Sequence, residues 1–330
     1  MMMMTLIYLD ALSGINYHRI LTPFIRMKEE KGLNTHYFDN FNQLKEWDLS
    51  KVNNLVISRR CSVSNHKEFK KFLNKNNIKL ILDNDDFWEL PKSNPARKHY
   101  ENVEKSNILN TIKIADEIWT PSEYLKNRMA MINPGVSIHV VPNTVYQKEK
   151  QWRDIKKDDN PKGLVRFGYL GANGHNEDLK VLGMTFEDYE LYCTRLGTFN
   201  GVGTLYSDFL RAKYPITPVE PHEYGSLYKK FDVSISPLAD SKFNRCKSDL
   251  KVVEAGFTKT AIIASNVRPY KQSIVHGKTG LLCNSPAEWR EAVSKMTLTQ
   301  AEDLGNNLYE HCKKEYDLHS INETRLKGLA

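Results

Sequence analysis

Short apolar segments alternate with amphipathic helical patterns along almost the whole chain. In the first half, five apolar segments have the length and composition of buried strands: "TLIYLD", "NLVISR", "IKLILDND", "EIWTPS" and "IHVVPN". Helical patterns stand between them, for example over residues 17–31 and 66–74. Such alternation is typical of α/β folds, because a parallel sheet needs a crossover, usually helical, between consecutive strands. The sequence therefore predicts an α/β fold with parallel sheets.

The alternation stops over residues 145–163 and then starts again. That segment, "VYQKEKQWRDIKKDDNPKG", is polar and has almost no apolar periodicity, which is typical of an inter-domain linker. Further strand-like segments follow it, namely "LVRFGYLG", "DVSISPL", "TAIIAS" and "TGLLCN", with helices expected from about Asn176 and Ser248. At 330 residues, the chain exceeds the size at which one core usually stops growing. We therefore expect an N-terminal Rossmann-like domain over 1–150 and a C-terminal one over 151–330, facing each other across a cleft. A last helix that ends at Asn322 or nearby could pack back across the linker on the N-terminal domain.

Composition and cysteine usage exclude several classes of protein. With 40% hydrophobic and 26% charged residues, the chain has the balance of a folded soluble protein. Its longest apolar segments are far too short to cross a membrane, and its start resembles a first strand more than a signal peptide. The five cysteines are scattered without a CxxC pair, which favours a reducing compartment and argues against a structural zinc site. We expect a cytoplasmic protein without a transmembrane segment, for which peripheral membrane contact remains open.

The net charge of +7 is unevenly distributed. Residues 1–150 carry 22 Lys and Arg against 17 Asp and Glu, whereas residues 151–330 carry 25 against 23. A modest basic excess fits an anionic partner such as nucleic acid, a membrane surface or a phosphorylated substrate. A lysine-rich composition that serves only solubility explains the same numbers, so both interpretations remain open.

The segment "KSDLKVVEAG" predicts a helix whose first turn could bind an anion. The free N–H groups of a first turn and the helix dipole together attract phosphate groups. Lys247 adds a mobile positive charge, and the free amides would be those of about Ser248 to Lys251. Glu254, two turns along, could accept hydrogen bonds from sugar hydroxyls. The alternative is an exposed amphipathic helix with Glu254 in water.

A second segment, "FGYLGANGHNEDL", predicts a strand, a glycine turn and a helix. Gly171 and Gly174 allow the backbone to approach a ligand closely, but the full GxGxxG of a dinucleotide site is missing. We expect His175 at the mouth of the cleft. A helix cap or a surface residue is the alternative for this histidine.

These segments together resemble a known family. Residues 243–282, "FNRCKSDLKVVEAGFTKTAIIASNVRPYKQSIVHGKTGLL", resemble the donor-binding segment of the group 1 retaining glycosyltransferases with the GT-B fold, of phage or bacterial type. The shared pattern is a loop, a helix ending in Glu-Ala, an apolar strand ending in Ala-Ser and a Gly-x-x-Gly-Leu-Leu turn. "GYLGANGHNEDL" is similar to the first turn of their C-terminal domain, and "EIWTPSEYLKNRM" and "VVPN" resemble their N-terminal landmarks. The resemblance is specific over 165–290 and looser over 1–145.

The resemblance implies a donor site. Glu254 would hold the ribose of a nucleotide sugar, and Lys247 with the backbone of Ser248, Asp249 and Leu250 would hold its diphosphate. A diphosphate leaving group develops charge that such donors stabilise, so a metal ion is not required.

Other donor-side positions are implied with less detail. Gly171 and His175 would line the donor site, and the loop at Gly14 would close over the donor from the other domain. One position departs from the pattern, because the family often has a glutamate eight residues before Glu254, where this chain has Cys246. That departure puts in doubt a carboxylate contact to the transferred sugar.

Several polar residues of the N-terminal domain are candidates for the acceptor side. Tyr17, His18 and Arg19 directly follow the glycine turn after the first strand, and Arg59 and Arg60 close another strand. An arginine is hard to bury without an anionic partner. We assign Tyr17, Arg19, Arg59 and Arg60 to the acceptor side and His18 to catalysis. Helical spacing alone would make Tyr17 a core residue.

The segment "LDNDDFWELP" imitates a metal-binding Asp-x-Asp but lies away from the expected diphosphate site. A metal site, a capped turn and an acceptor-side role are its three interpretations. We assign Asp85 to catalysis near the acceptor hydroxyl and expect no metal ion.

The functional hypothesis is therefore a glycosyltransferase (a hexosyl- or pentosyltransferase) that uses a nucleotide sugar, first of all a UDP-sugar, without a cofactor. Retention of configuration is implied by the resemblance alone. The acceptor would be an envelope glycan or a hydroxymethylated base in phage DNA. The rival hypothesis is a catalytically inactive protein that binds nucleotide sugars or nucleic acid. An NAD-dependent oxidoreductase is disfavoured, because "DALSGINYHRI" lacks GxGxxG.

Overall fold

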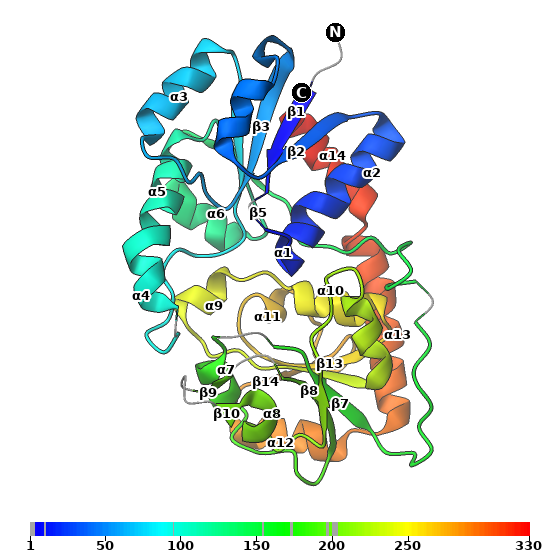
Figure 1. Ribbon diagram of the computed structural model, residues 1–330. Coiled ribbons are helices and arrows are strands. Elements are labelled where there is room, and N and C mark those ends of the chain that lie inside the picture. The colour runs from blue at the N-terminus through cyan, green and yellow to red at the C-terminus, as the bar shows by residue number, and fades with distance from the viewer. Residues whose placement is uncertain are drawn as a thin grey trace.

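The computed structural model describes residues 4–9, 11–94, 96–153, 155–171, 174–195, 198–199 and 204–330. These residues form two parallel six-stranded sheets, one above the other in Figure 1, each with helices packed on it. We call the part of the chain around the first sheet the N-terminal part and the part around the second sheet the C-terminal part. The α/β class predicted from the alternating segments is confirmed.

The N-terminal sheet has the strand order β2-β1-β3-β4-β5-β6. Its strands are β1 (Met4–Tyr8), β2 (Asn34–Phe38), β3 (Val52–Ser58), β4 (Lys79–Asp83), β5 (Glu117–Thr120) and β6 (Ser137–Val140). Its helices are α1 (Gly14–Asn16), α2 (Thr22–Lys31), α3 (His66–Lys75), α4 (Arg97–His99), α5 (Lys105–Ile114) and α6 (Glu123–Ala130). The helix predicted over 17–31 contains a π-helical turn, η1 (Tyr17–Leu21), and a second one, η4 (Tyr100–Glu104), precedes α5. Two 3₁₀ turns, η2 (Phe41–Glu46) and η3 (Leu49–Lys51), lead into β3.

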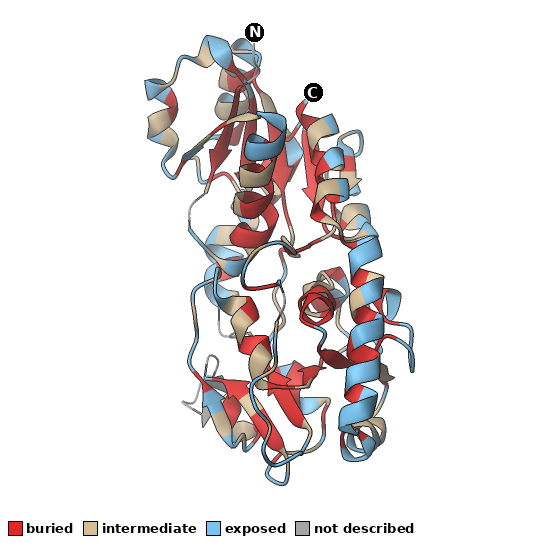
Figure 2. Cartoon of the chain, turned by 90° about the vertical axis from the view of Figure 1, so that its right-hand side faces the viewer, coloured by how far each residue is buried: buried red, intermediate tan, exposed pale blue. Residues whose placement is uncertain are grey.

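The C-terminal sheet has the order β11-β8-β7-β12-β13-β14, the arrangement of a Rossmann sheet. Its strands are β7 (Arg166–Tyr169), β8 (Glu190–Thr194), β11 (Tyr214–Ile216), β12 (Val233–Ser236), β13 (Ala261–Ser265) and β14 (Leu281–Cys283), with a small hairpin of β9 (Thr198–Phe199) and β10 (Thr204–Leu205) beside it. Its helices are α7 (Asn176–Lys180), α8 (Tyr206–Phe209), the 3₁₀ helix η5 (Tyr224–Lys230), α9 (Lys242–Cys246), α10 (Leu250–Phe257), α11 (Tyr270–Ser273), α12 (Pro286–Lys295) and α13 (Leu298–Glu315). Figure 2 shows buried strands between helices whose outer faces are exposed.

The last helix, α14 (Leu318–Leu329), packs against the N-terminal part. Ile321 and Leu329 belong to the same apolar cluster as Ile7 and Trp119 of that sheet. The amide of Asn54 donates to the Leu329 carbonyl at 2.9 Å. In Figure 1 the red helix lies beside β1 and α2, at the opposite end of the molecule from β14.

The polar segment 145–163 is not a free linker. Val145 and Trp152 are buried in the core of the C-terminal part. The ammonium of Lys157 donates to the carbonyls of Tyr228 and Phe231 at 2.9 and 2.8 Å. Residue 154 lies outside the described part, and the segment on either side of it is anchored to the C-terminal part by Val145, Trp152 and Lys157. The two sheets draw their strands from 4–140 and 166–283, and the domain boundary at residue 150 stays a prediction.

Helix α9 makes one of the close contacts between the two parts. Phe243 and Cys246 are buried in an apolar cluster with Phe87 and Trp88 of the N-terminal part. The Ser122 hydroxyl donates to the carbonyl of Cys246 at 3.4 Å. The position at which the family often has a glutamate thus packs between the two parts, and burial raises the pKa of the Cys246 thiol to about 12.

Candidate donor and acceptor site

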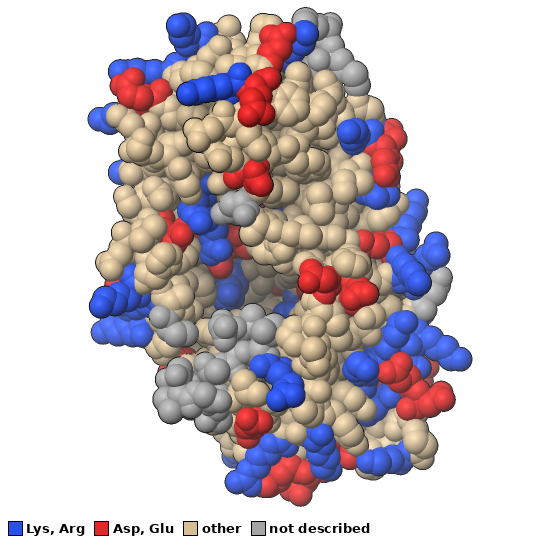
Figure 3. All heavy atoms as spheres, viewed as in Figure 1, with Lys and Arg blue, Asp and Glu red and all other residues tan. Residues whose placement is uncertain are grey.

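The carboxyl ends of the two sheets face each other, and the predicted residues follow the strands at those ends. Gly14 follows β1, Asp85 follows β4, Gly171 follows β7, and Lys247 follows β12. Ligands of open α/β sheets bind beyond these strand ends. Figure 3 shows a hollow between the two parts in which Lys and Arg side chains are visible.

Helix α10 presents free amides at its first turn. The N–H groups of Ser248, Leu250 and Lys251 have no acceptor among the described residues. Asp249 stands at the N-cap, but its carboxylate accepts from the Ser273 and Tyr316 hydroxyls instead of capping the helix. Burial raises the pKa of this carboxyl group. The first turn therefore has N–H groups available to an external anion.

Glu254 lies inside the protein and not in water. It is 2% exposed, and its Oε2 accepts hydrogen bonds from the Tyr228 hydroxyl and the Lys251 ammonium, both at 2.9 Å. The Lys251 ammonium also donates to the Tyr224 hydroxyl. Two tyrosines, Tyr228 and Tyr224, thus hold the Lys251–Glu254 pair, and Oε1 of Glu254 has no partner in the described part of the chain.

Lys247 carries a positive charge that no described carboxylate neutralises. It is half-buried at the end of α9, and its ammonium lies 4.7 Å from the centre of the Phe243 ring. The cation–π contact positions the ammonium without neutralising it. Lys247 therefore lies beside the open amides of α10 with its charge available.

A small cavity of about 40 Å³ lies at the carboxyl ends of β7 and β12. These neighbouring strands mark the point at which the strand order reverses, where ligands of such sheets bind. Gly171, His175, Ser236, Lys251 and Tyr270 contribute to its lining. The Ser236 hydroxyl is buried without a hydrogen-bond partner among the described residues. An unpaired buried hydroxyl is costly, so this cavity is a place where a polar ligand group would be stabilised.

Of the glycine turn after β7, residues 172 and 173 lie outside the described part, and a larger residue at Gly171 or Gly174 would require a neighbouring side chain to move. A Cβ at Gly171 would lie 2.3 Å from the Tyr169 hydroxyl oxygen, and one at Gly174, with φ of +98°, would lie 2.4 Å from Asn94 Nδ2. The Asn94 contact joins this turn to a loop of the N-terminal part. His175 lies at the start of α7, with Nδ1 2.7 Å from the Asp178 carboxylate.

On the N-terminal side, Gly14 borders open space and His18 is buried. Apart from the two chain neighbours and the backbone of its own helix, no heavy atom of the described residues lies within 4 Å of a Cβ placed on Gly14. His18 is 4% exposed, packs edge-on against Trp152 and has an unpartnered Nδ1 among the described atoms. Burial lowers the pKa of His18 to about 4, although Glu254 raises it. His18 is therefore neutral at physiological pH and lies close to the Lys251–Glu254 pair.

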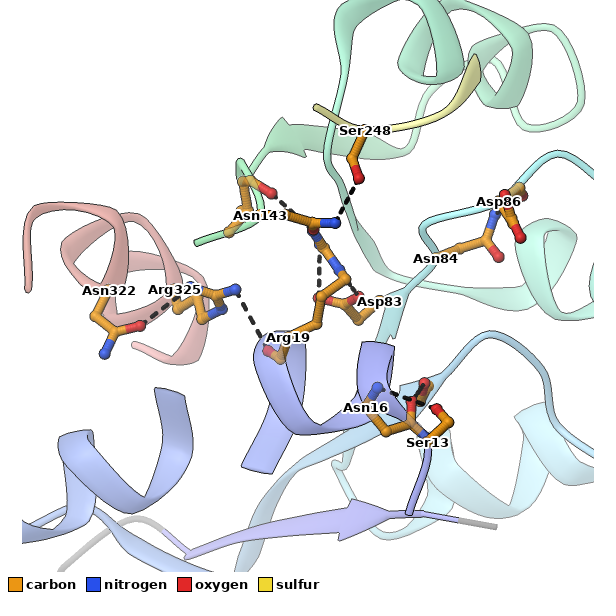
Figure 4. A network of polar contacts seen from close by, with 12 residues as sticks. Ser13, Asn16, Arg19, Asp83, Asn84, Asp86, Asn143, Ser248, Asn322 and Arg325 are labelled. Atoms are coloured by element: carbon orange, nitrogen blue, oxygen red, sulfur yellow. Dashed lines mark hydrogen bonds and ion pairs between the residues drawn. The ribbon is translucent and has the colours of Figure 1, made fainter. Parts of the chain in front are cut away.

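Arg19 and Tyr17 are interior residues. The Arg19 guanidinium donates to Asp83, to the Val141 carbonyl and to Asn143 (Figure 4), and the side chain is 2% exposed. The Tyr17 hydroxyl donates to Glu149, and burial followed by this bond raises the pKa of Tyr17. These placements favour a positioning role over contact with an acceptor.

Arg59 and Arg60 are each paired with a carboxylate. Arg59 Nη2 lies 3.1 Å from Asp86, and Arg60 pairs with Glu104 of η4. Arg59 has a positive φ of 66°, a conformation that costs energy in any residue but glycine and that is often found at functional sites. Beside them, burial and the Asp86 charge raise the pKa of Asp85 to about 6. Asp85 is thus the described N-terminal carboxyl best suited to exchange a proton near neutral pH.

Two further observations bear on cofactors and membranes. Within the described residues, no group of three or more His, Cys, Asp and Glu side chains could hold a metal ion. None of the helices in the described part of the chain is long and apolar enough to cross a membrane.

No protein-family model and no curated protein sequence matches this chain. Solved structures match it over its whole length. The sucrose-phosphate synthase of Thermosynechococcus elongatus has 10% identity and a TM-score of 0.65, covering 99% of this chain and 98% of its own. The chain has the GT-B fold. HepE of Anabaena, in complex with UDP and glucose, has 11% identity and a TM-score of 0.63, with 99% of both chains covered. The β-glucosyltransferase of phage T4 has 13% identity and a TM-score of 0.62, with 99% of both chains covered. The fold predicted from the resemblance is thereby confirmed.

Three side chains of the site were not predicted from the sequence. Lys251 and Tyr228 hold Glu254, and Asn143 contacts Ser248 of the other part. Lys251 stands three positions before Glu254, a spacing that pairs side chains on one helix face and could have been noticed. Tyr228 and Asn143 are distant in the sequence from their partners, and no local pattern indicates them.

Proposed function

We propose that this protein transfers a sugar from a nucleotide donor, a UDP-sugar, to an acceptor hydroxyl with retention of configuration. The open first turn of α10 beside the unneutralised Lys247 carries the proposal. The GT-B fold, shared with HepE in its complex with UDP and glucose, supports it.

On the donor side, the diphosphate would bind at the first turn of α10. The amides of Leu250 and Lys251 and the ammonium of Lys247 are donors that act where negative charge develops as the sugar–phosphate bond breaks. The free Oε1 of Glu254 would accept from the ribose hydroxyls, since Oε2 is held by Tyr228 and Lys251. These groups act without a metal ion. We therefore expect transfer to persist in EDTA, and loss of activity that Mn²⁺ restores would contradict this assignment.

On the acceptor side, Asp85 is the group we assign to deprotonation of the acceptor hydroxyl, because its raised pKa keeps it near the point of proton exchange. His18, buried and neutral beside Glu254, would contact the donor and not the acceptor. Arg59 would take part only after release from Asp86.

The test is transfer from a panel of nucleotide sugars, followed by mass spectrometry of the products. UDP-sugars should serve as donors, and NMR of the product should show the retained anomer. Slow hydrolysis of the donor without acceptor should also be seen. A protein that binds UDP but neither hydrolyses nor transfers would be the catalytically inactive binding protein considered above.

The acceptor is resolved by the same assay with three substrates. DNA containing hydroxymethylcytosine, unmodified DNA and a neutral oligosaccharide are offered in parallel. Transfer to modified DNA should weaken steeply with salt, because binding releases counterions from the phosphates. Transfer to the oligosaccharide alone, insensitive to salt, would leave the envelope-glycan acceptor. Activity in a cytoplasmic fraction would fit the proposed localisation.

A further inference from the structure

A chain of hydrogen bonds runs from the interior of the N-terminal part to the turn before α10 (Figure 4). Arg19 donates from Nε and Nη2 to the two carboxylate oxygens of Asp83 at 2.6 and 2.9 Å, and from Nη1 to the side-chain oxygen of Asn143. Asn143 Nδ2 then donates to Ser248 Oγ at 2.7 Å. Asp83, Arg19 and Asn143 are at most 2% exposed. The chain of bonds is therefore shielded from water up to Ser248.

The direction of each bond in this chain is fixed by chemistry. A guanidinium has donors only, so Asn143 must turn its carbonyl oxygen toward Arg19. The NH₂ group of Asn143 then faces Ser248, and the hydroxyl oxygen of Ser248 must accept. A hydroxyl that accepts from one side has its own proton on another side. No described residue accepts that proton.

The rest of the turn is also held in place. The Asp249 carboxylate accepts from Ser273 of α11 and from Tyr316 at the end of α13. The Ser248 side chain is thus bound by a residue of the N-terminal part, and the Asp249 side chain by residues of the C-terminal part. The groups of this turn that have no acceptor among the described residues are the Ser248 hydroxyl proton, the open amides of α10 and the Lys247 ammonium.

We propose that Asn143 is a positioning residue that sets the Ser248 hydroxyl as a hydrogen-bond donor to the diphosphate of the nucleotide. This inference rests on the proposed function, because it requires the nucleotide at α10. A diphosphate offers acceptors only, and a turn that presents only donors recognises it. The Arg19–Asp83 pair acts through Asn143, by holding its amide in one orientation.

The substitution Asn143→Asp should reverse the direction of the hydrogen bond between residue 143 and Ser248. A carboxylate at this position still accepts from Arg19, so the fold should be kept. The other oxygen of this carboxylate would accept a hydrogen bond from the Ser248 hydroxyl, so the hydroxyl proton would point away from the diphosphate. A lone pair of Ser248 and the negative charge of the new carboxylate would then lie near the diphosphate. We expect UDP affinity to fall by about tenfold or more, the scale of one hydrogen bond to a charged group. In Asn143→Ala, where Ser248 can rotate freely, the loss should be smaller.

Three controls separate positioning from general damage. Asn42→Asp adds the same charge at an exposed site of the N-terminal part and should leave UDP affinity unchanged. Affinity for uridine, which has no phosphate, should be the same in Asn143→Asp as in the unaltered protein. In the Ser248→Ala background, Asn143→Asp should lower UDP affinity less than it does in the otherwise unaltered protein, because there is no Ser248 hydroxyl whose orientation could change.

Isothermal titration with UDP and with uridine measures all of these, and thermal unfolding checks the fold. If the UDP affinity of Asn143→Asp is within twofold of that of the unaltered protein, the positioning role of Asn143 is overturned, while the proposed function stands. Equal losses for UDP and uridine would also overturn it, since the effect would then not depend on phosphate. Failure of the unaltered protein to bind UDP, GDP or ADP would overturn the proposed function and this inference with it.

Discussion

Replacement of Glu254 by glutamine tests the donor site most directly. Oε2 of Glu254 is occupied by Tyr228 and Lys251, and Oε1 is left for a ligand. A glutamine can turn its oxygen toward these two donors. Its NH₂ group then stands where the free carboxylate oxygen was, so an acceptor for the ribose is replaced by a donor.

The expected magnitudes follow from these contacts. A hydrogen bond to a charged group contributes about 1.5–3 kcal/mol, so UDP affinity should fall about 10- to 150-fold in Glu254→Gln. The free energy of unfolding should fall by only about 1 kcal/mol, because Tyr228 keeps an acceptor and the Lys251 side chain is 30% exposed. Glu254→Ala should lower the free energy of unfolding by about 3 kcal/mol, because it leaves the fully buried Tyr228 hydroxyl without an acceptor.

The assay is isothermal titration of both proteins with UDP, 2′-deoxy-UDP and 3′-deoxy-UDP. If Glu254 binds a ribose hydroxyl, the deoxy analogue and the Glu254→Gln substitution both remove the same contact. Their losses of binding free energy should then not add. Fully additive losses with both analogues would refute the ribose assignment. The matched control is Glu291→Gln on α12, whose side chain is 61% exposed and pairs with Lys295, and it should bind UDP normally.

Three further predictions concern Asp85, His18 and Lys247. The pKa of Asp85 is raised to about 6, so kcat/KM should rise as the pH increases through about 6. In Asp85→Asn this rise of kcat/KM with pH should disappear. If the rise remains, another group is responsible for it. His18 has a folded-state pKa of about 4 against 6.5 when unfolded, so the folded protein binds fewer protons between these values and loses about 3 kcal/mol of stability as pH falls from 6.5 to 4. Urea unfolding should show a shallower decline in His18→Gln, and parallel curves would contradict the burial argument. Lys247→Ala should lower kcat more than it raises the donor KM, because the Lys247 ammonium opposes the negative charge that develops on the leaving diphosphate. Steady-state kinetics measures both constants, and a change in KM alone would mean that Lys247 contacts the donor equally in the ground state and the transition state.

Much of the fold could be predicted because most strands are buried on both faces. β3, β4 and β13 each contain a buried apolar run, "LVI", "LIL" and "AIIA", as expected of a parallel sheet covered by helices. β2, β8 and β11 were not predicted. β2 and β11 are edge strands and β8 lies next to one; their sequences, "NTHYF", "ELYCT" and "YPI", mix polar and apolar residues. The other two edge strands, β6 and β14, were predicted because they overlap the apolar segments "IHVVPN" and "TGLLCN". The mixed composition of β2, β8 and β11 therefore explains why they were missed better than their position in the sheet does.

The candidate site was predictable only where its chemistry is local. The first turn of α10 and the carboxylate two turns later belong to one short segment, and their spacing indicates their roles. The burial of Arg19 could not be predicted in the same way, because its partner Asp83 is 64 positions away and Asn143 is 124. Arg19 has the same residue type as Arg59, yet one lies in the interior and the other at a strand end near the cleft. Tertiary contacts alone decide between these outcomes.

The return of α14 to the N-terminal part has a consequence for biosynthesis. Asn54 and Leu329, which share a hydrogen bond, are 275 positions apart, and the core around Ile7 and Trp119 includes Ile321 and Leu329. Domains usually fold as they emerge from the ribosome, the N-terminal one first. Here the β1–β6 sheet cannot complete its core until residues 318–329 have been made. The nascent sheet must then wait, with an apolar surface uncovered, through synthesis of the whole C-terminal part.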